Sequence, residues 1–325
     1  MVEMSTMDME EDYMWTGILH TEKHDYVLTL TSAQIVNGGN ITVYSQNFNF
    51  GSYTNEKGEK QTCVDIYVMH KPMTKKLPNI NYKIAKLIST HYHEKCSVDE
   101  KLKRGDGTQH MLLTAMTFVC KMCPFITGFE INDLSTRMCD NNTMINLSYF
   151  SITNYGQTWY ERHFKAYIPD ATSMRHRPLL HTTNNTNKPN NNTAKNTSHK
   201  KKEITKMDQY KDTIHKLMIQ PLPEWNIFKV IFLKSTPREI QQDLETLYRA
   251  SSTYGELFKN IHELGISKAC IYFESWINTV MTSTNLQNYI MFTQWIIPTK
   301  ELKQITIHRA TKDFAGKFAD YPKKM

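Results

Sequence analysis

Alternating apolar and polar residues in the first part of the chain predict an antiparallel β meander. Residues 26–31 and 41–44 are rich in β-branched and aromatic side chains, which strands favour. The Asn-Gly-Gly-Asn sequence at residues 37–40 separates them and is typical of a tight hairpin turn. A second turn is predicted over residues 51–58, and a third strand over residues 63–68.

Helical spacing follows the meander. Apolar residues at intervals of one, three and four predict a helix, and they are Leu112, Leu113, Met116, Val119 and Cys120. We expect this helix to stop at Pro124, because proline has no N–H to donate. Strands are predicted over residues 125–131 and 145–152, and a helix over residues 158–167. Residues 82–89 fit either a strand or a short helix.

Residues 182–203 divide the chain by their composition. They are rich in Asn, Thr and Lys and contain no large apolar residue, so they cannot bury enough surface to offset the entropy of ordering. We interpret them as a linker or a surface insertion. The remaining parts are then an acidic N-terminal tail (residues 1–12), a mixed α/β domain (residues 13–181) and a mainly helical second domain (residues 204–325).

The part of the chain after this boundary is predicted to be mainly helical. One helix face is formed by Ile204, Met207, Ile214, Leu217 and Met218. Pro237 suits the first position of another helix, and residues 271–280 and 286–297 add further helical segments. Residues 225–233 are predicted as a short apolar strand, and residues 305–307 as a last strand.

The net charge of +7 does not indicate a nucleic-acid-binding surface once the basic residues are located in the sequence. Six lysines lie in or beside the boundary segment, and they are Lys188, Lys195, Lys200, Lys201, Lys202 and Lys206. A short basic run in such a segment is more typical of a solvated tract than of a nucleic-acid-binding surface. We therefore do not expect nucleic acid as a partner.

The compartment is predicted from the N-terminal residues and the cysteines. The first residues are acidic where a signal peptide is basic, and no apolar region follows them. No window approaches the roughly 18 apolar residues that a membrane span needs. Six cysteines in 325 residues do not form a disulfide scaffold. We expect a soluble intracellular protein that is kept in a reducing compartment, is not secreted and has no membrane partner.

Gly105 and Gly107 stand just before the predicted helix. Glycines at such positions let backbone N–H groups converge on an anion. The helix dipole and the charge of Arg104 strengthen that preference, and a pyrophosphate group suits the arrangement. A turn that needs glycine only for its geometry explains the same residues, so both interpretations stay open.

Two motifs resemble the GNAT superfamily of acetyl-CoA-dependent N-acetyltransferases. Residues 104–108 (Arg-Gly-Asp-Gly-Thr) and the helix after them resemble the pyrophosphate loop of that family, and residues 158–164 (Thr-Trp-Tyr-Glu-Arg-His-Phe) resemble its later helix. The order of meander, glycine loop, helix, strand and helix is also similar over residues 13–170. The resemblance implies an α+β fold with an antiparallel-rich sheet, followed here by a mainly helical C-terminal region. The whole chain is also similar to proteins of large DNA viruses that infect protists.

The resemblance implies acetyl-CoA as the cofactor. The backbone N–H groups of Gly105, Gly107 and Thr108 would hold its pyrophosphate, with help from Arg104.

Catalytic roles follow from the same resemblance. Tyr160 would protonate the thiolate leaving group, and Glu130 or Asp133 would deprotonate the acceptor amine. The plain alternatives are a half-buried helix aromatic for Tyr160 and solvated strand ends for the two carboxylates.

Some positions depart from the family pattern. Leu102 stands where the family prefers Gln or Arg, Gln109 stands where a second small residue is common, and the later motif lacks its glycine. We therefore carry two functional hypotheses. The first is an N-acetyltransferase that acts on an unknown amine or protein acceptor. The second is a non-enzymatic viral structural or interaction protein that keeps the fold and docks a virion or host protein through residues 204–325.

A metal site is a competing interpretation. His91 and His93 share one face if they lie on a strand, and Cys120, Cys123 and Cys139 have the chemistry of zinc ligands. The two cysteines of the C-x-x-C motif, however, end an apolar helix, where buried thiols are ordinary core residues. No second C-x-x-C motif accompanies them, so we predict no metal.

Overall fold

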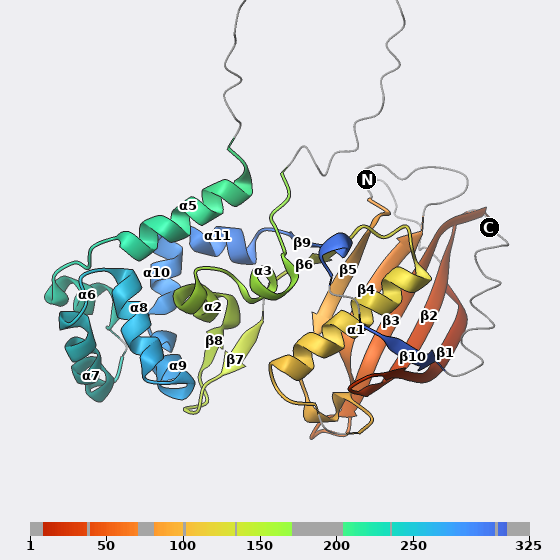
Figure 1. Cartoon of the computed structure of the whole chain (residues 1–325), viewed down its shortest axis with the longest axis horizontal. Coiled ribbons are helices and arrows are strands. Elements are labelled where there is room, and N and C mark those ends of the chain that lie inside the picture. The colour runs from red at the N-terminus through yellow and green to blue at the C-terminus, as the bar shows by residue number, and fades with distance from the viewer. Residues whose placement is uncertain are drawn as a thin grey trace, which may run out of the picture.

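The computed structural model of the chain describes residues 9–37, 40–70, 81–99, 102–133, 135–170, 204–234, 236–302 and 305–310. In these residues one large β-sheet occupies one side of the molecule, and a group of helices occupies the other (Figure 1). The predicted α+β class, with a mainly antiparallel sheet and a mainly helical C-terminal region, is confirmed.

The described residues form ten strands. In chain order they are β1 (Met9–Thr21), β2 (Asp25–Asn37), β3 (Asn40–Thr54), β4 (Lys60–His70), β5 (Ile84–Thr90), β6 (Gly128–Ile131), β7 (Thr136–Met138), β8 (Met144–Asn146), β9 (Trp295–Pro298) and β10 (Ile307–Ala310). The large sheet has the order β10-β1-β2-β3-β4-β5-β6-β9, and β7 pairs with β8 in a separate hairpin.

One helix, α1, covers a face of the sheet, and the other helices form the other side of the molecule (Figure 1). In chain order they are α1 (Asp106–Met122), α2 (Leu147–Tyr155), α3 (Trp159–Phe164), α5 (Lys206–Ile219), α6 (Trp225–Phe232), α7 (Arg238–Arg249), α8 (Tyr254–Glu263), α9 (Ile266–Glu274), α10 (Ile277–Ser283) and α11 (Leu286–Met291), with short 3-10 turns η1 (Glu94–Cys96) and η2 (Thr299–Glu301).

The predicted meander is confirmed, with longer strands than the sequence suggested. β1 to β4 pair antiparallel in sequence order, and Asn37 pairs with Asn40 at the predicted hairpin. β1 already begins at Met9, so the end of the acidic segment assigned to a tail lies in a strand. The turn expected over residues 51–58 is shorter, because β3 continues to Thr54.

β5 and β6 form a parallel pair inside this antiparallel sheet. Parallel neighbours need a crossover connection, and α1 provides it by packing on the face that the meander buries. The ring of Phe118 lies 6.3 Å from that of Phe48 and 5.8 Å from that of Phe50. The helix predicted before Pro124 is therefore confirmed, and residues 82–89 are resolved as a strand.

The C-terminal region returns to the sheet at both edges. β9 pairs antiparallel with β6, and β10 pairs antiparallel with β1. The helical segment expected over residues 286–297 is therefore wrong in its second half, where buried Ile296 and Ile297 find an open edge on β6. The last strand predicted at residues 305–307 is present slightly later, as β10.

Two further predicted strands are helices. Residues 225–233 form α6, because Phe228 and Leu233 point into an aromatic core while Val230 faces outward. In that core Trp276 has Phe228 and Phe258 as ring neighbours at 5.2 and 5.9 Å. The strand expected over residues 145–152 ends at Asn146, whose side chain accepts the N–H groups of Ser148 and Tyr149 and so begins α2.

The boundary segment, residues 182–203, lies outside the described residues. Its neighbours on both sides are described, and they meet: the Asp170 Oδ1 atom accepts the backbone N–H of Lys206 at 3.0 Å. A stretch whose two ends meet fits a surface insertion better than a connection between distant domains. The division into domains at this place stays a prediction.

Four of the six cysteines form two disulfides, Cys63–Cys96 and Cys139–Cys270. The second bond joins the β7–β8 hairpin to α9, across 131 residues of sequence. The expectation of reduced thiols is therefore wrong for these four residues, and the predicted reducing compartment loses its support from the cysteines. Among the described residues no helix is long and apolar enough to cross a membrane.

The contact between Asp170 and Lys206 and the Cys139–Cys270 disulfide predict how the chain behaves after limited proteolysis between residues 171 and 203. We expect two fragments on a reducing denaturing gel, but one band of full mass without reductant, because Cys139–Cys270 links them. The nicked protein should still elute as one species from a native sizing column, because β9 and β10 stay paired with the N-terminal strands.

A variant that combines Cys139→Ser with Cys270→Ser serves as the control. Its fragments should separate on the non-reducing gel and still elute together from the native column. Fragments that separate on that column without denaturant would show that the two regions are independent domains.

Candidate functional site

The candidate site lies where β5 and β6 part. Their pairing runs from Ile84–Gly128 to Lys86–Glu130 and stops there, although β5 continues to Thr90. Both strands end at the edge where α1 begins. The carboxyl ends of parallel strands and the following helix N-terminus are where α/β units place ligands.

A β-bulge marks this part of β5. Its register with β4 passes from Ile66–Leu87 to Asp65–Ser89, so Ile88 is an extra residue. A bulge leaves such a residue outside the ladder and bends the strand. The Ile88 side chain is more than half exposed, and β5 beyond Lys86 has no pairing with β6.

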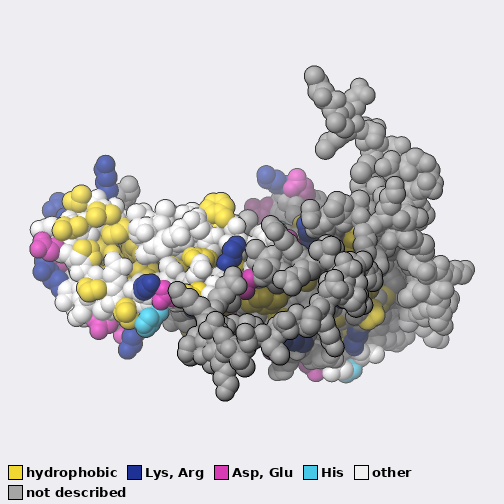
Figure 2. Space-filling model, turned by 90° about the horizontal axis from the view of Figure 1, so that it is seen from above, with side chains coloured by type: hydrophobic (Ala, Val, Ile, Leu, Met, Phe, Trp, Pro, Cys, Tyr) yellow, Lys and Arg dark blue, Asp and Glu magenta, His cyan; other side chains and the backbone are white. Residues whose placement is uncertain are grey.

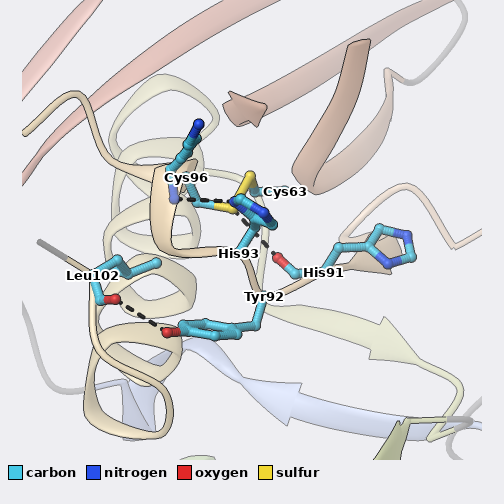
Figure 3. The surroundings of a disulfide bond; sticks show 7 residues. Cys63, His91, Tyr92, His93, Cys96 and Leu102 are labelled. Carbon is cyan, nitrogen blue, oxygen red and sulfur yellow. Dashed lines mark hydrogen bonds between the residues drawn. A yellow bond between two sulfur atoms is a disulfide. The ribbon is translucent and has the colours of Figure 1, made fainter. Parts of the chain in front are cut away.

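The loop before α1 is held against the end of β5. The Tyr92 hydroxyl donates to the Leu102 carbonyl oxygen at 3.1 Å, beside the Cys63–Cys96 disulfide (Figure 3). The Arg104 guanidinium carbon lies 6.0 Å from the centre of the Tyr92 ring. This arrangement brings an exposed cation to the start of the helix.

Two backbone N–H groups in the first turn of α1 already donate to carbonyl groups of the chain. Gly107 donates its N–H to the Lys103 carbonyl, and Gln109 donates to the Gly105 carbonyl, both at 2.9 Å. The Gly107 N–H, which was predicted to hold a pyrophosphate, is therefore already bonded within the chain, and its role in binding stays a prediction. Thr108, also predicted, has no backbone partner among the described residues and stays an available donor.

The two loop glycines have different physical roles. Gly105 precedes α1 with a φ of +86°, and a side chain there would meet open space, so its backbone angle requires glycine. Gly107 is buried, and a Cβ atom on it would lie 2.9 Å from Leu102 Cγ. The Leu102 side chain therefore occupies the space beside Gly107, and close packing explains this second glycine.

Tyr160 and Asp133 are brought together at the ends of the strands. Burial and, to a lesser degree, the Asp133 charge raise the pKa of Tyr160 to about 12, against hydrogen bonds with Ser135 and Thr90 that lower it. Burial also raises the pKa of Asp133 to about 6, against hydrogen bonds that lower it. The Asp133 Oδ2 atom is buried without a hydrogen-bond partner.

The helical region contributes to this cluster through α5. Tyr210 is fully buried, and its hydroxyl donates to Glu161 Oε2 at 3.5 Å, beside Tyr160 on α3. The charges of Glu161 and Asp133 add to burial in raising the pKa of Tyr210. Lys211 reaches Glu161 from the surface, with 3.7 Å between Nζ and Oε1. Sequence reasoning missed Tyr210 and Glu161, because contacts between α3 and α5 are long-range.

Glu130 is not part of the cluster. Its side chain accepts a hydrogen bond from Gln294 at 3.1 Å, next to the β6–β9 pairing. Of the two carboxylates considered as a base, Asp133 is the one that the structure brings to Tyr160.

Two basic groups lie near the α1 loop. Burial lowers the pKa of Arg137 on β7, and the neighbouring Arg104 charge lowers it further. Burial and Arg162 lower the pKa of His163 on α3, whereas Asp106 in the first turn of α1 acts in the opposite direction. These electrostatic contacts place β7 and α3 beside the loop.

Two of the residues considered for a metal have other partners. Cys139 is in a disulfide with Cys270, and the His93 Nδ1 atom accepts the Lys95 N–H at 3.2 Å. Burial raises the pKa of Cys120 to about 11 and that of Cys123 to about 12, so both are unreactive thiols at neutral pH. In the described part of the chain, no group of three or more His, Cys, Asp and Glu residues has the geometry to hold a metal ion.

Comparisons of the chain with protein-family models, curated proteins and solved structures found no match.

Close packing between Gly107 and Leu102 predicts that substitutions at these two positions have non-additive effects on stability. Gly107→Ala should destabilise the fold by about 1–3 kcal/mol in urea unfolding, because its new methyl group overpacks the Leu102 contact. Adding Leu102→Ala should recover part of this loss, so the double variant is less destabilised than the sum of the single variants. Strict additivity would show that Leu102 does not fill this space.

The raised pKa of Asp133 predicts that the stability of the fold depends on pH. Its folded pKa of about 6 exceeds the ordinary 3.8, so the folded state binds more protons and loses stability as the pH rises through this window. Asp133→Asn removes the titration and should gain about 2 kcal/mol relative to the parent between pH 4 and pH 7. Urea unfolding at both pH values measures the change, and an equal difference at both would contradict it.

Proposed function

We propose that this chain is an acetyl-CoA-dependent N-acyltransferase whose active site lies between the ends of β5 and β6. The observation that carries the proposal is the convergence of three features at one edge of the sheet. The pairing of the parallel strands ends at Lys86–Glu130, the N-terminus of α1 lies at that edge, and Tyr160 interacts there with Asp133 and with Thr90 at the end of β5.

The residues around the α1 loop suit a pyrophosphate group in part. Thr108 has a free backbone N–H, and Arg104 and Arg137 lie close enough for their charges to interact. The Asp140 carboxylate offsets part of this repulsion at Arg137, and a bound anion would offset more of it. Gly107 supports the site only through packing, and the Asp106 carboxylate weakens its preference for an anion. Arg104, Arg137 and Thr108 are therefore the residues proposed to hold the cofactor.

Bound acetyl-CoA would supply an acyl group activated as a thioester. Asp133 is proposed to accept the proton of the attacking amine, and its raised pKa makes it a stronger base than an ordinary carboxylate. Tyr160 is proposed to donate its phenolic proton to the sulfur that leaves. Its raised pKa keeps the phenol protonated at neutral pH, as an acid must be.

One observation favours the second hypothesis, an interaction protein without activity. Tyr160 is 5% exposed and Asp133 is 2% exposed, so a substrate reaches them only if the site opens. The helical end of the molecule displays hydrophobic side chains on its surface (Figure 2). On α6, the side chains of Ile227, Val230 and Ile231 are exposed. Such a patch would suit a virion or host protein as partner. The similarity to viral proteins stays a prediction.

Calorimetric titration with acetyl-CoA distinguishes the two hypotheses. We expect saturable binding, and Arg104→Ala should weaken it by about 1–3 kcal/mol, the value of one charge-assisted contact. The exposed Arg249 pairs with Glu245 on α7, so Arg249→Ala is the matched control and should leave binding unchanged. No heat at millimolar acetyl-CoA would favour the interaction protein.

Acetyl transfer to an amine tests the catalytic pair. Tyr160→Phe and Asp133→Asn should each slow transfer by about 10²–10⁴-fold while leaving acetyl-CoA binding intact, because each removes one proton-transfer group. Tyr155→Phe, which changes a half-exposed phenol near α3, should have no effect. Equal rates for Tyr160→Phe and the parent would remove Tyr160 from the mechanism.

A further inference from the structure

A cavity lies among α2, α5 and α8, helices on the side of the molecule away from the large sheet (Figure 1). It has a volume of about 420 Å³, within the range of small-molecule sites. Its walls come from the C-terminal ends of α2 and α5 and from one face of α8. None of its lining residues belongs to the site between β5 and β6.

Two glycines shape this cavity. Gly156 ends α2 with a φ of +69°, and a Cβ atom there would meet nothing within 4 Å, so the space beside it is open. Gly255 on α8 packs directly on α5, where a Cβ atom would lie 2.7 Å from the Met218 carbonyl oxygen. The close contact at Gly255 holds the helix ends together, and Gly156 leaves the entrance clear.

His262 is held in one orientation on the cavity wall. Its Nε2 atom lies 2.9 Å from the Thr153 hydroxyl, and Thr153 donates its single hydroxyl proton to the Phe150 carbonyl. Both contacts are satisfied together when Nε2 carries the proton and donates it to Thr153. Burial lowers the pKa of His262 to about 4, so the ring is neutral and its Nδ1 atom is a hydrogen-bond acceptor.

Charges of both signs stand beside this imidazole. Lys259 and Glu263 line the same cavity from α8, and their side chains are largely exposed, with 3.9 Å between Nζ and Oε1. An exposed pair at that distance is weak, so each group is available to a ligand. The C-terminal ends of α2 and α5 add the negative ends of two helix dipoles, which favour a cationic group.

We propose that this cavity binds a small zwitterionic amine of amino-acid or dipeptide size. Its ammonium group would donate to His262 Nδ1 and Glu263 near the helix ends, and its carboxylate would meet Lys259. The proposal does not depend on the acyltransferase function, because no residue is shared between the two sites.

Glycylglycine is the probe, and the backbone amide signals of Gly156 and Gly255 in the full chain report binding by nuclear magnetic resonance. We expect saturable shifts with a dissociation constant on the order of 1 mM. Glycylglycinamide lacks the carboxylate and N-acetylglycylglycine lacks the ammonium group. Each should bind about tenfold more weakly, because one charge-assisted contact is lost.

Lys259→Ala tests the assigned contact without touching the packed wall. It should weaken glycylglycine binding about tenfold and leave glycylglycinamide binding unchanged. The substitution of Lys259 and the loss of the ligand carboxylate remove the same contact, so their effects do not add. Lys268→Ala, an exposed lysine on α9, is the matched control and should bind like the parent. Absence of saturable shifts, equal binding of the three peptides, or no effect of Lys259→Ala would each overturn the proposal.

Discussion

The parallel pairing of β5 with β6 is the constraint on which the rest of the molecule depends. It covers only the pairs from Ile84–Gly128 to Lys86–Glu130, and it brings three strands together at Gly128. A Cβ atom there would lie 2.9 Å from Ile296 Cγ2 on β9 and 3.1 Å from Ile84 Cδ1 on β5. Without a side chain, Gly128 lets both neighbours approach β6. The crossover through α1, the opening beyond the pairing and the docking of β9 all follow from this contact.

β9 makes the helical region part of the same structure as the sheet. Its antiparallel pairing with β6 is extended by a bridge between Tyr167 and Ile296, which ties the end of α3 to the same strand. Tyr210 on α5 reaches the Glu161 carboxylate, and Cys139–Cys270 crosslinks the β7–β8 hairpin to α9. The candidate acid and base thus rest on elements from both halves of the chain, so disturbance of the helices would be transmitted to them.

Sequence patterns predicted the local features and missed the long-range ones. The meander, α1 and α3 were predictable because their signals, β-branched runs, helical spacing and proline stops, lie within one element. β9 was missed because its apolar residues fit a helix or a strand equally well, and only the open edge of β6 decides between them. α6 was misread because apolar residues on both its faces remove the helical period. The disulfides depend on three-dimensional proximity, which spacing does not reveal.

The candidate site was also predictable from the sequence only in part. Tyr160 and Asp133 were named from local motifs, and the structure brings them together, but their burial could not be foreseen. The motif also suggested that Gly107 serves an anion, whereas the structure assigns it to packing on Leu102. Leu102 itself, a departure from the family pattern, turns out to fill the space that this glycine leaves.

The buried Asp133 carboxylate bears on the choice between an enzyme and an inactive fold. Its Oδ2 atom has no partner, and burial raises its pKa to about 6, so at neutral pH the fold keeps an ionised group that is only partly satisfied. A well-packed apolar residue at such a position is commonly as stable or more stable. Hydrogen bonds with Ser135 lower the pKa of Asp133 and offset part of this cost. Proton transfer at the proposed active site would give the carboxylate a second role, because a base gains strength from the same burial that makes it costly.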